Sequence, residues 1–162
     1  MKERMLEDLF HDTLKDIYYA ERKILRALPK MARAAQSPDL QGAFEHHRQE
    51  TQEQIERLQE VFEAIGRNPR GKTCPAIDGI IEEAEEIMDE YKGSKALDAG
   101  LISSAQAVEH YEITRYGTLR RWAQELGNSK AEKLLAQTLD EEARTDALLT
   151  KIADAGANAE AA

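Results

Sequence analysis

The sequence predicts an all-α fold, a four-helix bundle with a short extra helix in the crossover between its two helical hairpins. The chain has 162 residues, of which 41% are hydrophobic and 33% charged, as is typical of a helical domain with solvated outer faces. Aromatic residues are few and strong helix formers dominate. Turn signals separate long segments whose apolar residues recur at helical spacing, and we expect residues 1–162 to form one domain.

Turn signals set the boundaries of the predicted helices. Ser37 and Pro38 separate the first two segments, residues 65–75 hold two of the four prolines, and Gly127 ends a later segment. The prediction is four long helices and one short helix, over 5–35, 39–66, 76–91 (the short one), 95–127 and 129–154. Short links within each half and a long link between the halves are typical of a bundle with a crossover. No large apolar residue follows Ile152, so we expect about 155–162 to form a frayed tail.

Each long helix carries an apolar stripe that can face a shared core. The stripes are Leu6, Phe10, Leu14, Ile17, Ile24, Leu28 and Met31; Leu40, Phe44, Leu58, Val61 or Phe62, and Ile65; Ile102, Ala105, Tyr116, Leu119, Ala123 and Leu126; and Leu135, Leu139, Leu149 and Ile152. Every stripe turns polar near its middle. The interruptions are therefore matched between helices, and they need a physical explanation.

Charge and hydropathy exclude several classes of function. A net charge of −9 argues against non-specific binding to nucleic acid or to an anionic membrane surface, because Lys and Arg lead both interactions. The N-terminal residues lack a signal-peptide core, and no run of about 18 apolar residues occurs, so a cytoplasmic protein is expected. Cys74, the single cysteine, cannot form an internal disulfide, and we interpret it as a buried or inert thiol.

Acidic and amide side chains fill the interruptions. The first helix contributes Glu21, the second Glu50 and Gln54, the third Glu109 and Glu112, and the fourth Glu142 and Asp146. If the first hairpin turns near residue 37, Glu21 lies within one turn of Glu50 and Gln54 on the antiparallel partner. Both halves of the chain then deliver acidic groups to one level of the bundle.

The second hairpin gives the same result. A turn near residue 127 places Glu109 opposite Asp146, and it places Glu112 opposite Glu142. A single Glu near a seam is more often solvated than buried, but matched acids in four helices favour a metal site. Ionised carboxylates without partners are costly to bury, and no Lys or Arg occupies these seam positions. Oxygen-rich sites of this kind suit hard divalent cations.

Five ordered phrases carry a family resemblance: "YYAERKILRALPKMARAA", "ETQEQIERL", "CPAIDGIIEEAEEI", "VEHYEITRYGTL" and "TLDEEARTDALL". With them the sequence resembles the ferritin-like di-iron carboxylate superfamily, and within it the bacterial YciE/YciF-like stress-protein family, up to about residue 152. The resemblance implies a ferritin-like bundle and a dinuclear metal site. Its implied ligands are Glu21, Glu50, Glu109, Glu112 and Glu142.

The sequence departs from the Glu-x-x-His pattern of that superfamily in two helices. Glu53 stands where the second helix needs its histidine, and Gln54, on the seam side, is the preferred ligand. His47 is one turn before Glu50, and its interpretation as a packed imidazole or outer-shell group is preferred over that of a ligand. In the fourth helix Thr145 replaces the histidine, and Asp146 lies on the seam side.

The leading hypothesis is a redox enzyme in which Glu21, Glu50, Glu109, Glu112, Glu142 and Asp146 hold two ions of iron or manganese. The resemblance implies dioxygen or hydrogen peroxide as the substrate, in ferrous-iron oxidation or peroxide removal during stress. We expect a homodimer. The alternatives are an iron-storage or DNA-protecting assembly with the same fold, and a metal-free helical interaction module.

Overall fold

The computed structural model describes residues 2–162, in which all regular secondary structure is helical and no strand is present. The five main helices are α1 (Leu6–Ala34), α2 (Pro38–Ala64), α3 (Pro75–Glu90), α4 (Leu97–Glu125) and α5 (Ser129–Ile152). They are followed by the π-helical turn η1 (Ala153–Ala157) and by α6 (Asn158–Ala161). The five predicted helices are confirmed, with boundaries that differ from the predicted ones by at most two residues.

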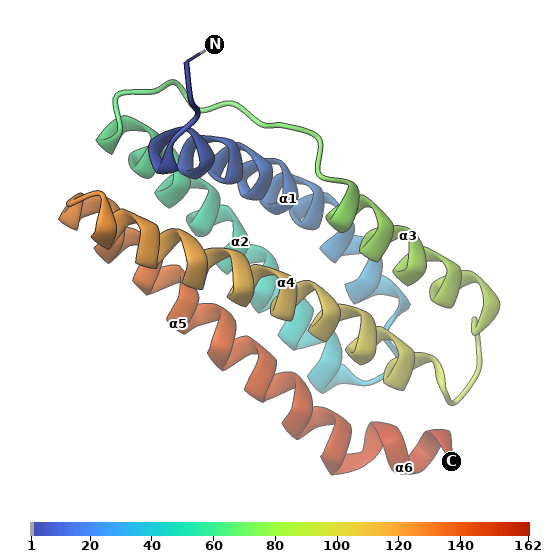
Figure 1. Ribbon diagram of the computed structural model, residues 1–162. Helices are drawn as coiled ribbons and strands as arrows, with labels where there is room; N and C mark the ends of the chain where they lie inside the picture. The colour runs from blue at the N-terminus through green and yellow to red at the C-terminus, as the bar shows by residue number, and fades with distance from the viewer. Residues whose placement is uncertain (1) are drawn as a thin grey trace.

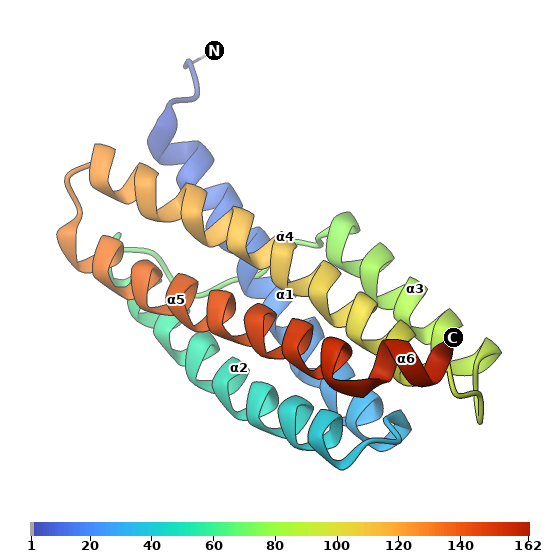
Figure 2. The same cartoon turned by 90° about the horizontal axis from the view of Figure 1, so that it is seen from below.

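The four long helices enclose one core (Figure 1). Helix α1 packs on α2 and on α4, and α5 packs on α4 and on α2. Figure 2 shows these helices running side by side, and α3 lies outside them against α1 and α4. The core includes Phe10, Leu14, Ile17, Phe44, Leu58, Phe62, Leu101, Ile102, Tyr116, Leu119 and Leu135. The predicted stripes therefore face inward, and helix α3 covers one side of the packed helices.

Local capping explains where three helices begin. The Ser37 hydroxyl accepts the backbone N–H of Leu40 at 3.4 Å, and Pro38 follows it as the first residue of α2. The side-chain oxygen of Asn128 accepts the N–H of Ala131 at 3.0 Å at the start of α5. At the start of α3, the Cys74 sulfur accepts the N–H of Ile77 at 3.4 Å. The sequence thus determines these helix starts with short polar side chains.

Two side-chain contacts link the hairpins to each other, one at each end of the bundle, and each contact involves the turn of one hairpin. Asp98, buried near the start of α4, accepts the backbone N–H groups of Gln36 and Ser37, each at 2.8 Å. At the opposite end, the Asn128 amide donates to the carbonyl of Ala64 at 3.0 Å. We call these the Asp98 and Asn128 contacts.

The C-terminal residues differ from the expectation of a frayed tail. In the structure residues 153–157 form a π-helical turn, and α6 continues to Ala161. Ala153 is buried, and Ala157 packs against the edge of the core. Small alanines can contact the core here without a large apolar residue, and alanine favours helix, which together explain the difference.

Two further expectations concern Cys74 and the membrane. Cys74 is buried, as predicted, with its sulfur 3.0 Å from the Tyr111 hydroxyl, and burial raises the pKa of its thiol. Within residues 2–162, every helix is too short or too polar to cross a membrane.

Candidate metal centre

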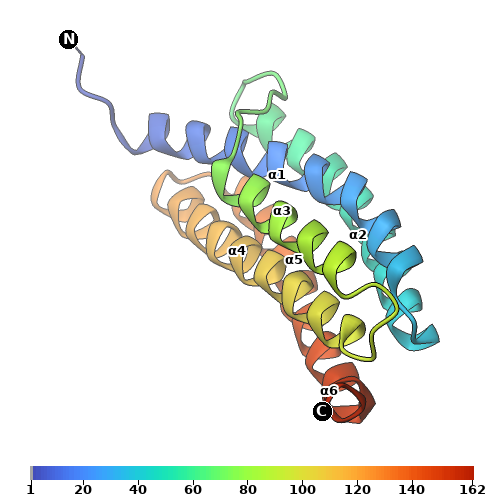
Figure 3. The same ribbon diagram turned by 90° about the vertical axis from the view of Figure 1, so that its right-hand side faces the viewer.

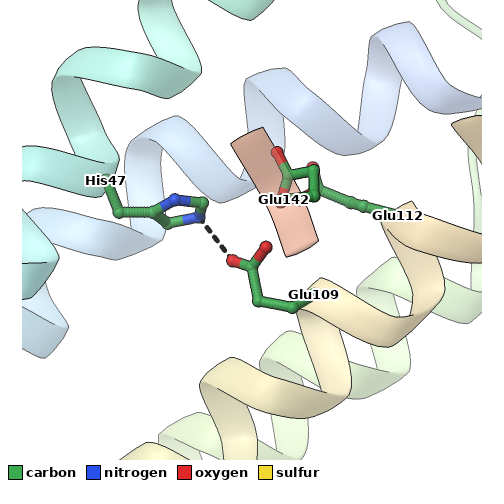
Figure 4. Close-up of side chains that lie close together, drawn as sticks. All are labelled: His47, Glu109, Glu112 and Glu142. Carbon is green, nitrogen blue, oxygen red and sulfur yellow. Dashed lines mark ion pairs between the residues drawn. The ribbon is translucent and has the colours of Figure 1, made fainter. Parts of the chain in front are cut away.

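Four buried side chains from three helices converge inside the protein (Figure 4). They are His47 from α2, Glu109 and Glu112 from α4, and Glu142 from α5, and each offers one ligand atom within 4.8 Å of the others. We call this set the His47 cluster. Glu109 and Glu112 are three residues apart, so they lie on one face of their helix. Helical spacing and the packing of α2, α4 and α5 together position the cluster.

The imidazole of His47 joins α2 to α4 (Figure 4). Its Nε2 atom lies 2.8 Å from Oε1 of Glu109, and both side chains are at least 95% buried. The other ring nitrogen, Nδ1, is buried and has no hydrogen-bond partner within residues 2–162. His47 can therefore act as a hydrogen-bond donor to the carboxylate or as a nitrogen ligand.

The carboxyl groups of the His47 cluster lack compensating partners. Apart from the His47 contact, both oxygens of Glu109, Glu112 and Glu142 are buried without a hydrogen-bond partner in residues 2–162. Unpaired carboxylates in such surroundings cost several kcal/mol each, on the order of magnitude known for buried ions. Hard oxygen donors with one imidazole match the donor set that a hard divalent cation accepts, so these residues could hold a metal ion.

Without a metal ion, the cluster can avoid burying unpaired negative charge by binding protons. Burial raises the pKa of Glu109 to about 8, with the charge of Glu21 adding to the effect. Burial also raises the pKa values of Glu112 and Glu142 well above the usual range, and negative neighbours reinforce both shifts. Neutral carboxylic acids must therefore lose protons when a cation binds here, which makes cation binding pH-dependent.

Glu21 lies beside the cluster on α1. The Tyr116 hydroxyl donates to Oε1 of Glu21 at 3.0 Å, while Oε2 is buried without a partner in the described chain. Burial raises the pKa of Glu21 to about 7, and the nearby charge of Glu142 adds to this shift. Glu21 thus has one oxygen fixed by a tyrosine and one oxygen free, as a bridging or terminal ligand requires.

Glu50 is at the rim of the site. It is half-buried, with Oε1 3.6 Å from the exposed His46 ring and Oε2 accepting from the Thr145 hydroxyl at 3.3 Å. Asp146 is also half-buried: one oxygen lies 3.1 Å from Nε2 of the exposed His110, and the other is buried without a partner.

The predicted pairing of Glu109 with Asp146 is not the contact found in the structure. Glu109 lies against His47, with the Glu142 carboxyl beside it. The charge of Asp146 contributes to the raised pKa of Glu109, but one Asp146 oxygen contacts His110 and the other is buried without a partner in residues 2–162.

Gln54 is buried, whereas the rival position, Glu53, is exposed. The Gln54 amide nitrogen donates to Glu141 at 3.3 Å, and its oxygen is buried without a partner in residues 2–162. Arg57 pairs with Glu141 at 2.8 Å, and both are nearly buried. The buried arginine of this region therefore neutralises Glu141 and not the His47 cluster.

Comparison with known proteins assigns the chain to a family. The family model described as domain of unknown function, DUF892, matches residues 5–162. The chain belongs to the DUF892 family. Among curated relatives, Protein YciF of Escherichia coli strain K12 is 45% identical over 154 residues, which cover 94% of this chain and 93% of YciF. The predicted resemblance to YciF-like stress proteins is confirmed at this level.

Solved structures place this DUF892 chain among proteins of the same shape. The crystal structure of the E. coli stress protein YciF superposes with a TM-score of 0.92 at 44% identity, covering 96% of this chain and 99% of YciF. YcfI of Rhodopseudomonas palustris gives 0.89 at 48% identity, with 91% and 94% covered. A Xanthomonas campestris protein gives 0.77 at 21% identity, with 96% of each chain covered, and shares the fold alone.

The structure adds two features to this DUF892 site. His47, expected on the seam as a packed or outer-shell imidazole, lies within the central cluster and contacts Glu109, and whether it binds an ion directly stays a prediction. The pair of Arg57 with Glu141 was not predicted, and its signal was an arginine three residues after Gln54 on a buried face.

Proposed function

We propose that this DUF892 protein is a dinuclear metal carboxylate protein with a ferritin-like bundle, which uses iron or manganese to react with dioxygen or hydrogen peroxide in stress protection. The observation that carries the proposal is the His47 cluster, whose three buried carboxyl groups pair with no Lys or Arg of residues 2–162. YciF is described as a stress protein, which supports the proposed role in stress protection.

The proposed ligands form two groups: the His47 cluster, and the residues that surround it. His47, Glu109, Glu112 and Glu142 would hold the first ion, because their ligand atoms already converge. Glu21, with one free buried oxygen, is the nearest candidate for a bridge to a second ion. The half-buried Glu50 and Asp146, together with the buried Gln54, would complete the set.

A bound pair of redox-active ions would supply the electrons for reduction of dioxygen or peroxide. The chain's own residues prepare the site for this chemistry. Tyr116 fixes the orientation of Glu21 through its hydroxyl. Buried apolar residues on either side of the cluster exclude bulk water. In the metal-free protein, whose Glu21 and Glu109 have pKa values raised to about 7 and about 8, these carboxyl groups hold protons near neutral pH and release them when a cation binds.

Metal analysis of the purified protein tests the proposal. After incubation with ferrous iron or manganese, we expect two bound ions per chain and oxidation of ferrous iron by dioxygen or peroxide. Glu142→Ala should abolish both results. The control, Glu60→Ala, removes an exposed acid of α2 and should change neither. Retention of no metal by the unaltered protein would overturn the proposal in favour of a metal-free helical module.

We also infer a homodimer as the assembly, and size-exclusion chromatography tests it. A cage of many subunits would instead support the iron-storage alternative. Oxidation rates measured on the same chromatographic fraction separate an enzyme from a storage shell, since an enzyme continues to turn over peroxide after its sites have filled.

A further inference from the structure

The loop between α2 and α3, residues 65–74, collects positive charge on an acidic protein. Arg67, Arg70 and Lys72 fall within six residues, and the loop contains no acidic residue, although the chain carries a net charge of −9. Within residues 2–162, none of the three cations has an acidic partner within ion-pair distance. Their charges therefore face solvent without local neutralisation.

The loop is fixed on α1, as its path in Figure 3 shows. The backbone N–H of Lys72 donates to the carbonyl of Lys15 at 3.1 Å. Gly71 lies so close to α1 that a Cβ atom there would be 3.3 Å from Cβ of Tyr19. Gly66 begins the loop with a φ of +68°. This docking holds the cationic side chains near the first half of α1.

A hollow of about 650 Å³ lies between the loop and α1. His11 and Lys15 line it from α1, Arg67, Arg70 and Lys72 line it from the loop, and no acidic side chain lines it. Two acids of α1 lie beside the hollow: Asp12 is 3.0 Å from Lys15 and also pairs with Arg4, and Glu7 shares the adjoining pocket with His11 and Arg67. Burial lowers the pKa of His11, and the charges of Lys15 and Arg67 lower it further. The side chains of the hollow thus create a positive local potential.

We propose that this hollow, between Arg67, Arg70 and Lys72 of the loop and Lys15 of α1, binds a small molecule that bears phosphate. Arginine guanidinium groups bind phosphate oxygens in pairs, and lysine adds a compact charge. The volume exceeds that needed for one phosphate group and lies within the range of small-molecule sites, so a diphosphate or a phosphorylated organic molecule fits.

A nucleic acid fits the hollow less well. The basic residues occupy one loop and one face of α1, and a duplex needs an extended row of phosphate contacts. The rest of the acidic surface would repel a long polyanion. The proposed site is also separate from the His47 cluster: His11 precedes Glu21 by ten residues, about 15 Å along α1. It does not depend on the proposed metal chemistry.

Titration of the full chain with pyrophosphate, followed by amide NMR shifts at low ionic strength, tests the proposal. We expect saturable shifts at residues 66–72 and near His11, and none centred on His47 or Glu109. Arg67→Gln with Arg70→Gln should weaken binding at least about tenfold, because two charge-assisted contacts are lost. The matched control is Lys130→Gln with Lys133→Gln, which removes two exposed cations of α5 and should change binding less than about twofold.

Three outcomes would overturn the proposal: the absence of shifts at millimolar pyrophosphate, equal weakening by both double variants, or shifts centred on the His47 cluster. Tighter binding of a 12-base-pair DNA duplex than of pyrophosphate would replace the small molecule with nucleic acid. Thermal unfolding of each variant verifies folding, which these exposed positions should leave unchanged. Binding that survives in a Glu142→Ala protein without metal separates this result from the proposed function.

Discussion

Nε2 of His47 lies 2.8 Å from Oε1 of Glu109, and this contact joins α2 to α4 at the level where the core becomes acidic. The neighbouring residue, His46, is on the same helix but points to solvent, where it approaches Glu50. Two consecutive histidines thus occupy a buried and an exposed environment, and they provide a matched comparison.

His47→Ala should weaken metal binding about 10–100-fold, whether the imidazole binds the ion or orients Glu109. His46→Ala should leave affinity within about threefold, because its side chain is 66% exposed. Competition with a chelator of known affinity measures both. Equal effects of the two substitutions would exclude a special role for His47.

Glu141 and Glu142 are adjacent in sequence but should respond in opposite ways to substitution by glutamine. Glu142→Gln removes a buried carboxyl without a partner, so the metal-free protein should gain about 1–2 kcal/mol in free energy of unfolding at pH 8. Glu141→Gln leaves Arg57 without its ion pair and should cost about 3–5 kcal/mol. Urea denaturation measures both values. A loss of stability in both variants would mean that the Glu142 carboxyl has a stabilising hydrogen-bond partner in the folded protein.

The stability of the metal-free protein should fall as pH rises from about 4.5 to about 8. The pKa values of Glu21 and Glu109 are raised to about 7 and about 8, so in this window the folded state binds more protons than the unfolded state. Each group then contributes a decrease of up to about 1.4 kcal/mol per pH unit. Urea denaturation at pH 5, 6.5 and 8 measures the slope.

Glu109→Gln should reduce that slope, since it removes one of the titrating groups. Saturating metal should reverse the trend, because deprotonated carboxylates bind the ion more tightly as pH rises. A stability profile that is flat from pH 5 to 8 without metal would show that the cluster is already compensated.

Gly100 sets how closely α3 approaches α4. A Cβ atom at this position would lie 2.7 Å from Cγ2 of Ile87, so Gly100→Ala should destabilise the protein by about 1–3 kcal/mol. Gly79, in the exposed face of α3, has no atom within 4 Å of the added Cβ, and Gly79→Ala should stabilise by about 0.5–1 kcal/mol. Thermal unfolding compares the two. Equal stabilisation by both substitutions would mean that α3 and α4 can move apart at no cost in free energy of unfolding.

Most of the fold could be predicted from sequence because its signals are local. Ser37 and Asn128 cap their helices, and the apolar stripes follow the helical period. Antiparallel counting also identified the level of Glu112 and Glu142, which the structure brings together. Counting residues from a hairpin turn predicts the position of a side chain along the helix axis, but it does not predict how the helix is rotated about that axis.

Rotation and rotamers decide the remaining part of the site. Asp146 is at the predicted height, yet one of its carboxyl oxygens contacts the exposed His110 and not Glu109. The seam position of His47 could be predicted, but the sequence cannot distinguish a ligand from a residue that orients Glu109. The partner of Arg57 could not be inferred, because Glu141 is one position away from the predicted seam residue and only tertiary packing selects it.

The Asp98 and Asn128 contacts lie at opposite ends of the protein, far from the acidic level, yet they determine whether that level exists. A shift of one hairpin along the other by a single residue would move its side chains by about 1.5 Å, and a shift by one turn would move them by about 5.4 Å. Either shift would break both contacts. The contacts at the two turns therefore prevent one hairpin from sliding along the other. Hydrogen bonds to backbone groups far from the carboxylates thus maintain the spacing of the carboxylates.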